Sequence, residues 1–179
     1  MILSPARLST LSKNEELITN LDLRERLSPE GAGYDLRVNS IEEVCGSGSL
    51  LIETRHTSTI NKIGMFEADG PQILTLKGQS LYLVSTVEEF KLHDNMAAVF
   101  YPRSTLFRSG VIFQSGVAPY GYEGPMTFLL YIANPAGFEV QLGARFAHVL
   151  IHRVIGKSTR YKGQWQGGRV TTNKREKQI

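Results

Sequence analysis

Residues 102–110 read P-R-S-T-L-F-R-S-G and hold the side chains best suited to bind a polyphosphate. Arg103 and Arg108 lie five residues apart and bracket the hydroxyls of Ser104 and Thr105. A guanidinium group pairs with phosphate oxygens through two N–H groups at once, and hydroxyls and backbone N–H groups at a turn complete such a cradle. Arginines beside Ser and Thr are also common on solvated loops, so the pattern predicts a phosphate site only together with its neighbours.

A glycine-punctuated turn that begins at Gly116 is the second candidate. Glycine lets the backbone approach a ligand closely, and an exposed Tyr122 could cover a sugar ring or a base. Glu123, on the same turn, is the only carboxylate between Asp94 and Glu139 and is therefore the candidate for proton transfer in this region. The alternative is an ordinary hairpin with a structural tyrosine and a surface glutamate.

The C-terminal residues are the third candidate. Residues 153–179 carry 8 Lys and Arg against one Glu, whereas residues 1–152 carry 12 Lys and Arg against 16 Asp and Glu. Gln166 and Arg169 lie beside glycines and the single tryptophan, a composition that fits a lid over a nucleotide. The alternatives are a disordered, solubilising tail and a loose nucleic-acid contact. Nucleic-acid binding is disfavoured, because the strands lack the interleaved aromatic and basic residues that single-strand binders use.

Metal and nucleophile chemistry find little support in the sequence. His148 and His152 lie in a strand-like stretch, where a spacing of four residues separates them by about 13 Å, too far to share an ion. Cys45 is the only cysteine, which excludes an internal disulfide and a cysteine metal cluster. No G-x-S-x-G nucleophile elbow is present. We therefore predict no metal site built by the protein itself.

The elements that must position these residues read mostly as strands. The 179 residues suffice for one domain with a substantial core. Ser4 followed by Pro5 predicts a helix start, with Leu8, Leu11, Leu17 and Ile18 as its apolar face. Short alternating runs separated by turn residues then predict strands at 34–38, 50–52, 72–76, 80–84, 96–101, 111–113, 126–132, 138–142 and 146–155.

This pattern predicts an all-β fold, a distorted β-barrel or jelly roll with a short helical N-terminal part. We expect a single β-barrel nucleotide-binding domain over residues 1–156 and a basic, flexible C-terminal lid over residues 157–179. The sequence has no apolar run of membrane-spanning length and its N-terminus lacks signal-peptide features, so we expect a cytoplasmic protein without membrane contact.

Taken in order, these segments resemble the dCTP deaminase branch of the dCTP deaminase/dUTPase superfamily. The opening M-I-L-S resembles the start of that family, and residues 33–38 resemble its S-Y-D-L-R-L strand. Residues 83–92 are similar to its L-x-x-T-x-E-x-x-x-L segment and lead into its R-S-S-L-x-R-x-G phosphate motif at residues 103–110. The turn at residues 116–124 resembles the A-G-V-I-D-P-G-F-x-G hairpin, and residues 164–167 resemble the C-terminal K-Y-Q-G-Q.

The resemblance implies a homotrimer with active sites between subunits and a deoxynucleoside triphosphate held with Mg²⁺. It assigns the phosphates to Arg103, Ser104, Thr105 and Arg108, and the nucleoside to Gly116 and Tyr122. Gln166 and Arg169 would close the lid.

Three departures from the family pattern bear on catalysis. The hairpin aspartate that activates water in dUTPases falls on Pro119, the catalytic glutamate of the deaminases falls on Leu129, and a strand glutamine is His148. Neither Leu nor Pro can carry the proton that deamination or phosphoanhydride hydrolysis requires.

Three functions therefore stay open. The first is an enzyme of pyrimidine deoxynucleotide metabolism resembling dCTP deaminase, with Glu123 as its best acid. The second is a catalytically inactive nucleotide-binding regulator or scaffold on the same fold. The third is a dUTPase-like pyrophosphatase. Asp35, Glu88 and Glu89 are further acids that could contribute.

Overall fold

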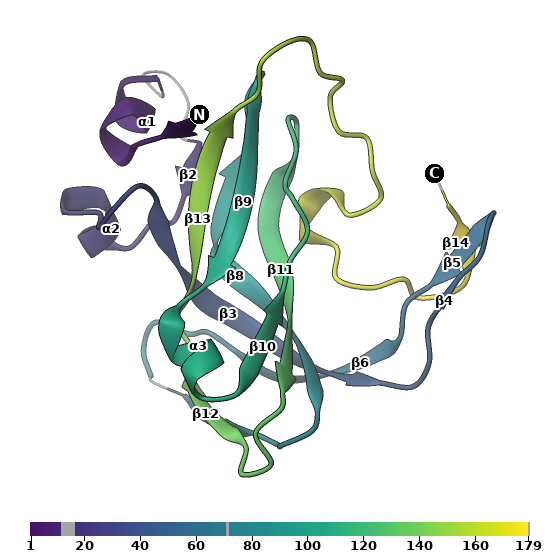
Figure 1. Ribbon diagram of the computed structural model, residues 1–179. Helices are drawn as coiled ribbons and strands as arrows, with labels where there is room; N and C mark the ends of the chain where they lie inside the picture. Colours follow the sequence, from purple (N-terminus) through teal and green to yellow (C-terminus); the bar gives the residue numbers. More distant parts are fainter. Residues whose placement is uncertain (12–16, 71, 179) are drawn as a thin grey trace.

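The computed structural model describes residues 1–11, 17–70 and 72–178, most of them in strands (Figure 1). The strands are β1 (Ile2–Leu3), β2 (Ile18–Thr19), β3 (Tyr34–Cys45), β4 (Ser49–Leu50), β5 (Thr54–His56), β6 (Thr59–Met65), β7 (Ile73–Leu76), β8 (Leu81–Lys91), β9 (Met96–Pro102), β10 (Val111–Gln114), β11 (Glu123–Ile132), β12 (Phe138–Gln141), β13 (Arg145–Arg153) and β14 (Glu176–Lys177). The helical elements are α1 (Pro5–Leu11), α2 (Leu23–Leu27), α3 (Ser104–Arg108) and the 3-10 turn η1 (Gln166–Gly168). In this part of the chain, no helix combines the length and the apolar character needed to cross a membrane.

The largest sheet is antiparallel and has the order β1-β13-β3-β8-β11-β10. β9 also pairs with β13, β6 with β3 and β2 with β8, while β12-β7 and β14-β5-β4 form two small sheets. Figure 1 shows the β4–β5 arm projecting from the main body, with the C-terminal segment returning to it as β14. The all-β class with a short helical N-terminal part is confirmed, although the strand order does not close into a complete barrel.

The core forms on one face of the central strands. Along β11, buried residues alternate with half-exposed ones, as the period of two requires. The buried side chains pack on an aromatic cluster of Phe90, Phe100, Phe113, Phe128 and Phe146, whose neighbouring ring centroids lie 4.9 to 6.3 Å apart. The other side of these strands, termed here the outer face, holds Ser40 and Glu42 of β3, Leu83 and Ser85 of β8, Thr127 and Leu129 of β11, and Gln114 of β10.

The expected N-terminal helix is confirmed. Pro5 is its first residue, and the Ser4 hydroxyl accepts the Arg7 backbone N–H at 3.3 Å. Leu8 is buried as expected, whereas Leu17 and Ile18 are buried at β2 rather than on a helix. The side chain of Leu11 lies outside the described residues.

Each predicted strand is present with shifted ends, and several elements were missed, among them β6 and α3. The expected strand at 50–52 ends at Leu50, and β8 continues from the expected stretch as far as Lys91. β6 pairs only with β3 in the main sheet and is largely exposed, so its sequence shows no clean alternation. α3, with five residues, is too short to produce a helical period.

Candidate functional site

A cavity of about 410 Å³ lies between the glycine-rich turn and the C-terminal residues. This volume is in the range of small-molecule sites. Its lining comprises Thr57, Gly116, Val117, Ala118, Pro119, Tyr122, Met126, Thr127, Tyr161, Trp165, Arg169 and Val170. The structure therefore brings together three of the predicted residues, namely Gly116, Tyr122 and Arg169.

Backbone hydrogen bonds hold the glycine-rich turn in place. Ala118 and Ala98 exchange N–H···O bonds of 2.8 and 3.1 Å, and the Gly121 N–H donates to Leu92 at 2.8 Å. Gly121 has φ 80°, which favours glycine, and the Arg160 side chain occupies the place of a Cβ there. A Cβ on Gly116 would meet nothing within 4 Å, so this wall of the cavity is open.

Tyr122 is a fixed wall of the cavity rather than the exposed ring that the sequence suggested. It is buried, and its hydroxyl donates to the Pro125 carbonyl at 2.5 Å. Its ring centroid lies 6.0 Å from that of Tyr161, a tail residue. Burial, with Tyr161 as a second cause, raises the pKa of Tyr122 to about 12, so the phenol stays neutral at physiological pH.

The tail forms the other wall through Trp165. The Arg55 guanidinium lies 4.4 Å from the Trp165 ring centroid and that of Arg169 lies 5.9 Å from it. Both guanidinium groups also bind Glu176 of β14, at 2.9 and 2.7 Å. Hydrogen bonds from Arg169 and then Arg55 lower the pKa of Glu176. This cluster gives the tail a defined packing position, while its opening as a lid stays a prediction.

Gln166 lies beside the cavity and supports it without lining it. Its side-chain amide donates to the Gly121 carbonyl at 2.9 Å. The predicted lid residue thus fastens η1 to the turn.

Glu123 is engaged elsewhere. Its carboxylate accepts a hydrogen bond from Arg160 at 2.7 Å, both side chains are exposed, and Glu123 is not among the cavity residues. Within a single chain, Glu123 therefore forms an ion pair with Arg160. A role for Glu123 in proton transfer stays a prediction.

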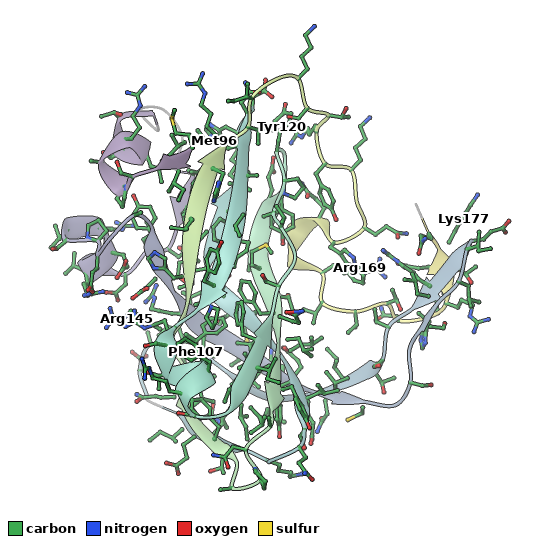
Figure 2. The ribbon with its side chains drawn as sticks, in the orientation of Figure 1. Met96, Phe107, Tyr120, Arg145, Arg169 and Lys177 are labelled. Carbon is green, nitrogen blue, oxygen red and sulfur yellow. The ribbon has the colours of Figure 1, made fainter. Side chains whose placement is uncertain are left out.

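The predicted phosphate residues lie around α3, away from the cavity. Ser104, Thr105 and Arg108 are exposed. Among the described residues Arg108 makes no ion pair, and its guanidinium lies 5.7 Å from the Phe107 ring centroid. Figure 2 shows Phe107 and Arg145 on one side of the strands and Arg169 on the other. One chain therefore carries both predicted halves of a nucleotide site but does not join them.

Asp35 fixes Arg103, a link that the sequence did not reveal. The Arg103 guanidinium contacts the Asp35 carboxylate. The same carboxylate lies 2.9 Å from His148 Nδ1, 3.3 Å from Arg145 and 3.7 Å from Arg24. Burial lowers the pKa of His148, so this histidine is neutral near pH 7. The sequence offered Asp35 only as one of several further acids, because a single sequence does not show which cations meet it.

A second buried carboxylate, Glu25 of α2, completes this cluster. It accepts the Asp35 backbone N–H at 3.0 Å and an Arg24 hydrogen bond at 2.7 Å. The two buried acids face three arginines, Arg24, Arg103 and Arg145, all of which reach solvent in part. Glu30 also binds Arg24 at 2.8 Å, so three carboxylates balance these three arginines. Arg108 of α3, which makes no ion pair among the described residues, is the cation that favours an anion here.

The positions of the family acids hold apolar side chains. Leu129 lies half-exposed on the outer face, opposite Leu83, and Pro119 lines the cavity. The described lining of the cavity contains no carboxylate. Any acid or base must therefore come from outside this lining.

Comparison with known proteins fixes the family. The profile of dCTP deaminase-like proteins matches residues 2–154. The chain belongs to this dCTP deaminase-like family. It is 31% identical over 154 residues to a probable deoxyuridine 5'-triphosphate nucleotidohydrolase of Methanothermobacter thermautotrophicus, covering 85% of this chain and 97% of that protein. It is 30% identical over 165 residues to the dCTP deaminase of Pyrococcus furiosus, covering 91% and 94% of the two chains.

The fold of this chain resembles that of a solved structure. The 2'-deoxycytidine 5'-triphosphate deaminase from Agrobacterium tumefaciens superposes with a TM-score of 0.61 at 18% identity. The match covers 84% of this chain and 46% of that longer chain. At this identity the likeness concerns the fold alone. The family relatives act on deoxynucleoside triphosphates, as their names state.

Proposed function

We propose that this protein is an enzyme of pyrimidine deoxynucleotide metabolism that binds a deoxynucleoside triphosphate between the subunits of a homotrimer. The observation that carries the proposal is the cavity between the glycine-rich turn and the tail, with Tyr122, Tyr161 and Trp165 as aromatic walls and Arg169 at its edge. Aromatic faces suit a base or a sugar, and an arginine suits a phosphate. The names of the family relatives point to the same substrate class.

The two halves of the site divide the substrate between them. The nucleoside would occupy the cavity, and the triphosphate would reach Arg108, Ser104 and Thr105 of a neighbouring subunit. These three side chains are exposed, and Phe107 beside them is 57% exposed, as expected of a surface that another subunit covers. A second chain is what would bring the phosphate residues to the cavity.

Mg²⁺ would enter as part of the substrate. Magnesium prefers carboxylate, phosphate and water oxygens. Because the cavity lining described above includes no carboxylate, the residues there do not form a magnesium site of their own. The triphosphate oxygens would hold the ion.

Two reactions are compatible with this site. One is dCTP + H₂O → dUTP + NH₃, and the other is dUTP + H₂O → dUMP + pyrophosphate. Both consume a water molecule that must lose a proton to a nearby base. The names of the relatives cover both reactions, so the choice rests on the base that the cavity accepts.

A nucleotide-binding regulator without turnover is the second candidate. Leu129 and Pro119 at the positions of the family acids favour it, as does the ion pair that occupies Glu123. It shares the binding site with the first candidate and differs only in product formation.

Incubation of the purified protein with Mg²⁺ and each of dCTP, dUTP, dATP, dGTP and dTTP separates these candidates, with products resolved by ion-exchange chromatography. The proposal expects dUTP or dUMP from dCTP, or dUMP and pyrophosphate from dUTP. Binding without any product would select the regulator. Absence of binding to all five nucleotides would contradict both. Arg108→Ala should abolish binding, because Arg108 is proposed to hold the triphosphate. The variant should still fold, because Arg108 is exposed and lies outside the buried ion-pair cluster.

A further inference from the structure

A buried carboxylate on the outer face lies in line with the position of the missing acid. Glu42 of β3 is 5% exposed, and its Oε2 has no hydrogen-bond partner among the described residues. In the sheet register Glu42 lies opposite Leu83, and Leu83 lies opposite Leu129. Directly opposed residues point to the same face of a sheet. Glu42 and Leu129 therefore share the outer face, about 10 Å apart across two strand spacings.

Two serine hydroxyls extend from this carboxylate toward the cavity. Ser40 and Glu42 lie two residues apart on β3 and therefore point to the same face of the sheet. The Ser40 and Ser85 hydroxyl oxygens lie 2.6 Å apart. Ser85 lies opposite Thr127 in the register, and Thr127 lines the cavity. The hydroxyl groups of Ser40, Ser85 and Thr127 thus lie in a row on the outer face, between the buried acid and the cavity wall.

The hydrogen-bond directions along this row can reverse. The Ser85 oxygen accepts the Ser40 backbone N–H at 3.2 Å, which leaves its own proton free to point either way. When Glu42 is ionised, Ser40 donates to it and Ser85 donates to Ser40. When Glu42 is protonated, each hydroxyl donates in the opposite direction, toward Thr127. Such a row can carry a proton both ways.

The electrostatics of Glu42 suit this exchange. Burial raises the pKa of Glu42, while the Ser40 hydrogen bond and the Lys62 charge oppose the rise. Lys62, opposite Glu42 on β6, is the charged group that faces it, and Leu83 and Ser85 on β8 are uncharged. A raised pKa makes the Glu42 carboxylate a better proton acceptor than an ordinary glutamate.

We propose that Glu42 supplies, through Ser40 and Ser85, the proton acceptor and donor that the cavity lining lacks. A water bound at Thr127 would give a proton to Ser85 as Ser85 gives one to Ser40 and Ser40 gives one to Glu42. The resulting hydroxide attacks the substrate, and the proton returns along the row to the departing ammonia or pyrophosphate. Water is the only co-reactant. Glu42 acts through Ser85 without touching the substrate, and the inference rests on the proposed function.

Three substitutions with one matched control test this relay. For Glu42→Gln we expect kcat to fall about 10²–10³-fold, the usual contribution of general acid–base catalysis, with KM changed less than about 3-fold. The fall of kcat on acidification should vanish, because the group that must be ionised is absent. Ser85→Ala should lower kcat similarly, and Glu42→Asp should retain part of the pH dependence. Glu43→Gln, half-exposed beside Lys77, should leave every parameter unchanged.

The outcomes separate the relay from the proposed function. The relay would be overturned, and the proposed function kept, if the wild type turns over and both Glu42→Gln and Ser85→Ala retain its kcat and pH profile. If urea unfolding shows that Glu42→Gln does not fold, the test of the relay uses Ser85→Ala instead. The solvent isotope effect on kcat is then compared between the wild type and Ser85→Ala. An isotope effect that Ser85→Ala leaves unchanged would also overturn the relay. Absence of wild-type turnover on all five nucleotides would instead overturn the proposed function.

Discussion

Asp35 binds the guanidinium of Arg103 and so fastens the start of the phosphate motif to β3 of its own subunit. The Arg103 backbone N–H also donates to Phe146 at 2.9 Å, which sets the point where β9 ends and α3 begins. Arg103 thus positions Ser104 and Arg108 by its structural contacts. Its guanidinium has five N–H donors, so those not used by Asp35 can still reach a phosphate.

Asp35→Asn should lower the free energy of unfolding by about 2 kcal/mol. Removal of one partner from a buried ion pair costs more, about 3–5 kcal/mol, but here the three arginines reach solvent. Urea unfolding measures the change. Glu30→Gln is the control, because Glu30 is exposed and binds only the outer side of Arg24, so its change should stay below about 1 kcal/mol. Equal effects of the two substitutions would contradict the clustered arrangement around Asp35.

The buried phenol of Tyr122 predicts a loss of stability at high pH. Its pKa is about 12 in the folded chain, above the ordinary value of 10. The unfolded chain therefore loses this proton first, so stability should fall as the pH rises from 10 to 12. Tyr122→Phe should remove that part of the slope while costing about 1 kcal/mol at neutral pH through the lost bond to Pro125. Urea unfolding across this pH range checks it, and a wild-type slope retained in Tyr122→Phe would refute the assignment.

Glu123→Gln should change kcat less than about 3-fold. The carboxylate is exposed and bound to Arg160, and such surface pairs contribute about 0–1 kcal/mol to stability. Steady-state kinetics on the preferred nucleotide measures the effect, with Arg160→Gln as the partner variant. A loss above about 100-fold in Glu123→Gln alone would restore Glu123 as the acid and weaken the case for Glu42.

Trp165 is the only tryptophan, so its fluorescence reports on the tail alone. The lowered pKa of Glu176 means that its attraction for Arg169 and Arg55 is present above the ordinary carboxyl pKa and is lost as the pH falls through the folded value. We expect the Trp165 emission to shift to longer wavelength on acidification, as β14 and the tail separate from β5. Glu176→Gln should show the shifted emission already at pH 7, and exposed Glu139→Gln should not. Identical spectra for wild type and Glu176→Gln at pH 7 would contradict the clamp around Trp165.

Local patterns in the sequence were sufficient for most of the fold. Alternation marks β11 and the core face, and Ser4 with Pro5 marks the start of α1. The exposed edge strand β6 and the five-residue α3 carry no such pattern and were missed. The place of β6 depends on its pairing with β3, which a single sequence does not show.

The site divides in the same way. Gly116, Tyr122 and Arg169 could be chosen by residue type, and the structure gathers them around one cavity. The hydroxyl row from Glu42 could not be foreseen, because it depends on the pairing of β3 with β8 and of β8 with β11, and on a bulge in β3. Ion pairs cannot be read from the sequence either. Glu123 was the candidate for proton transfer in the sequence, and in the structure its carboxylate is bound by Arg160.

Subunit mixing tests the central claim, a nucleotide site completed by two chains. Arg108→Ala removes the phosphate half, and Gly116→Trp fills the cavity, where an added Cβ meets no atom within 4 Å. Each variant alone should bind no nucleotide, whereas Gly116→Ala should still bind. The two variants are co-expressed with different tags and purified on both, so that only mixed trimers remain. Each mixed trimer has one of its three interfaces with both intact halves, so about a third of the wild-type sites should return. Binding that stays absent in verified mixed oligomers would contradict a shared site.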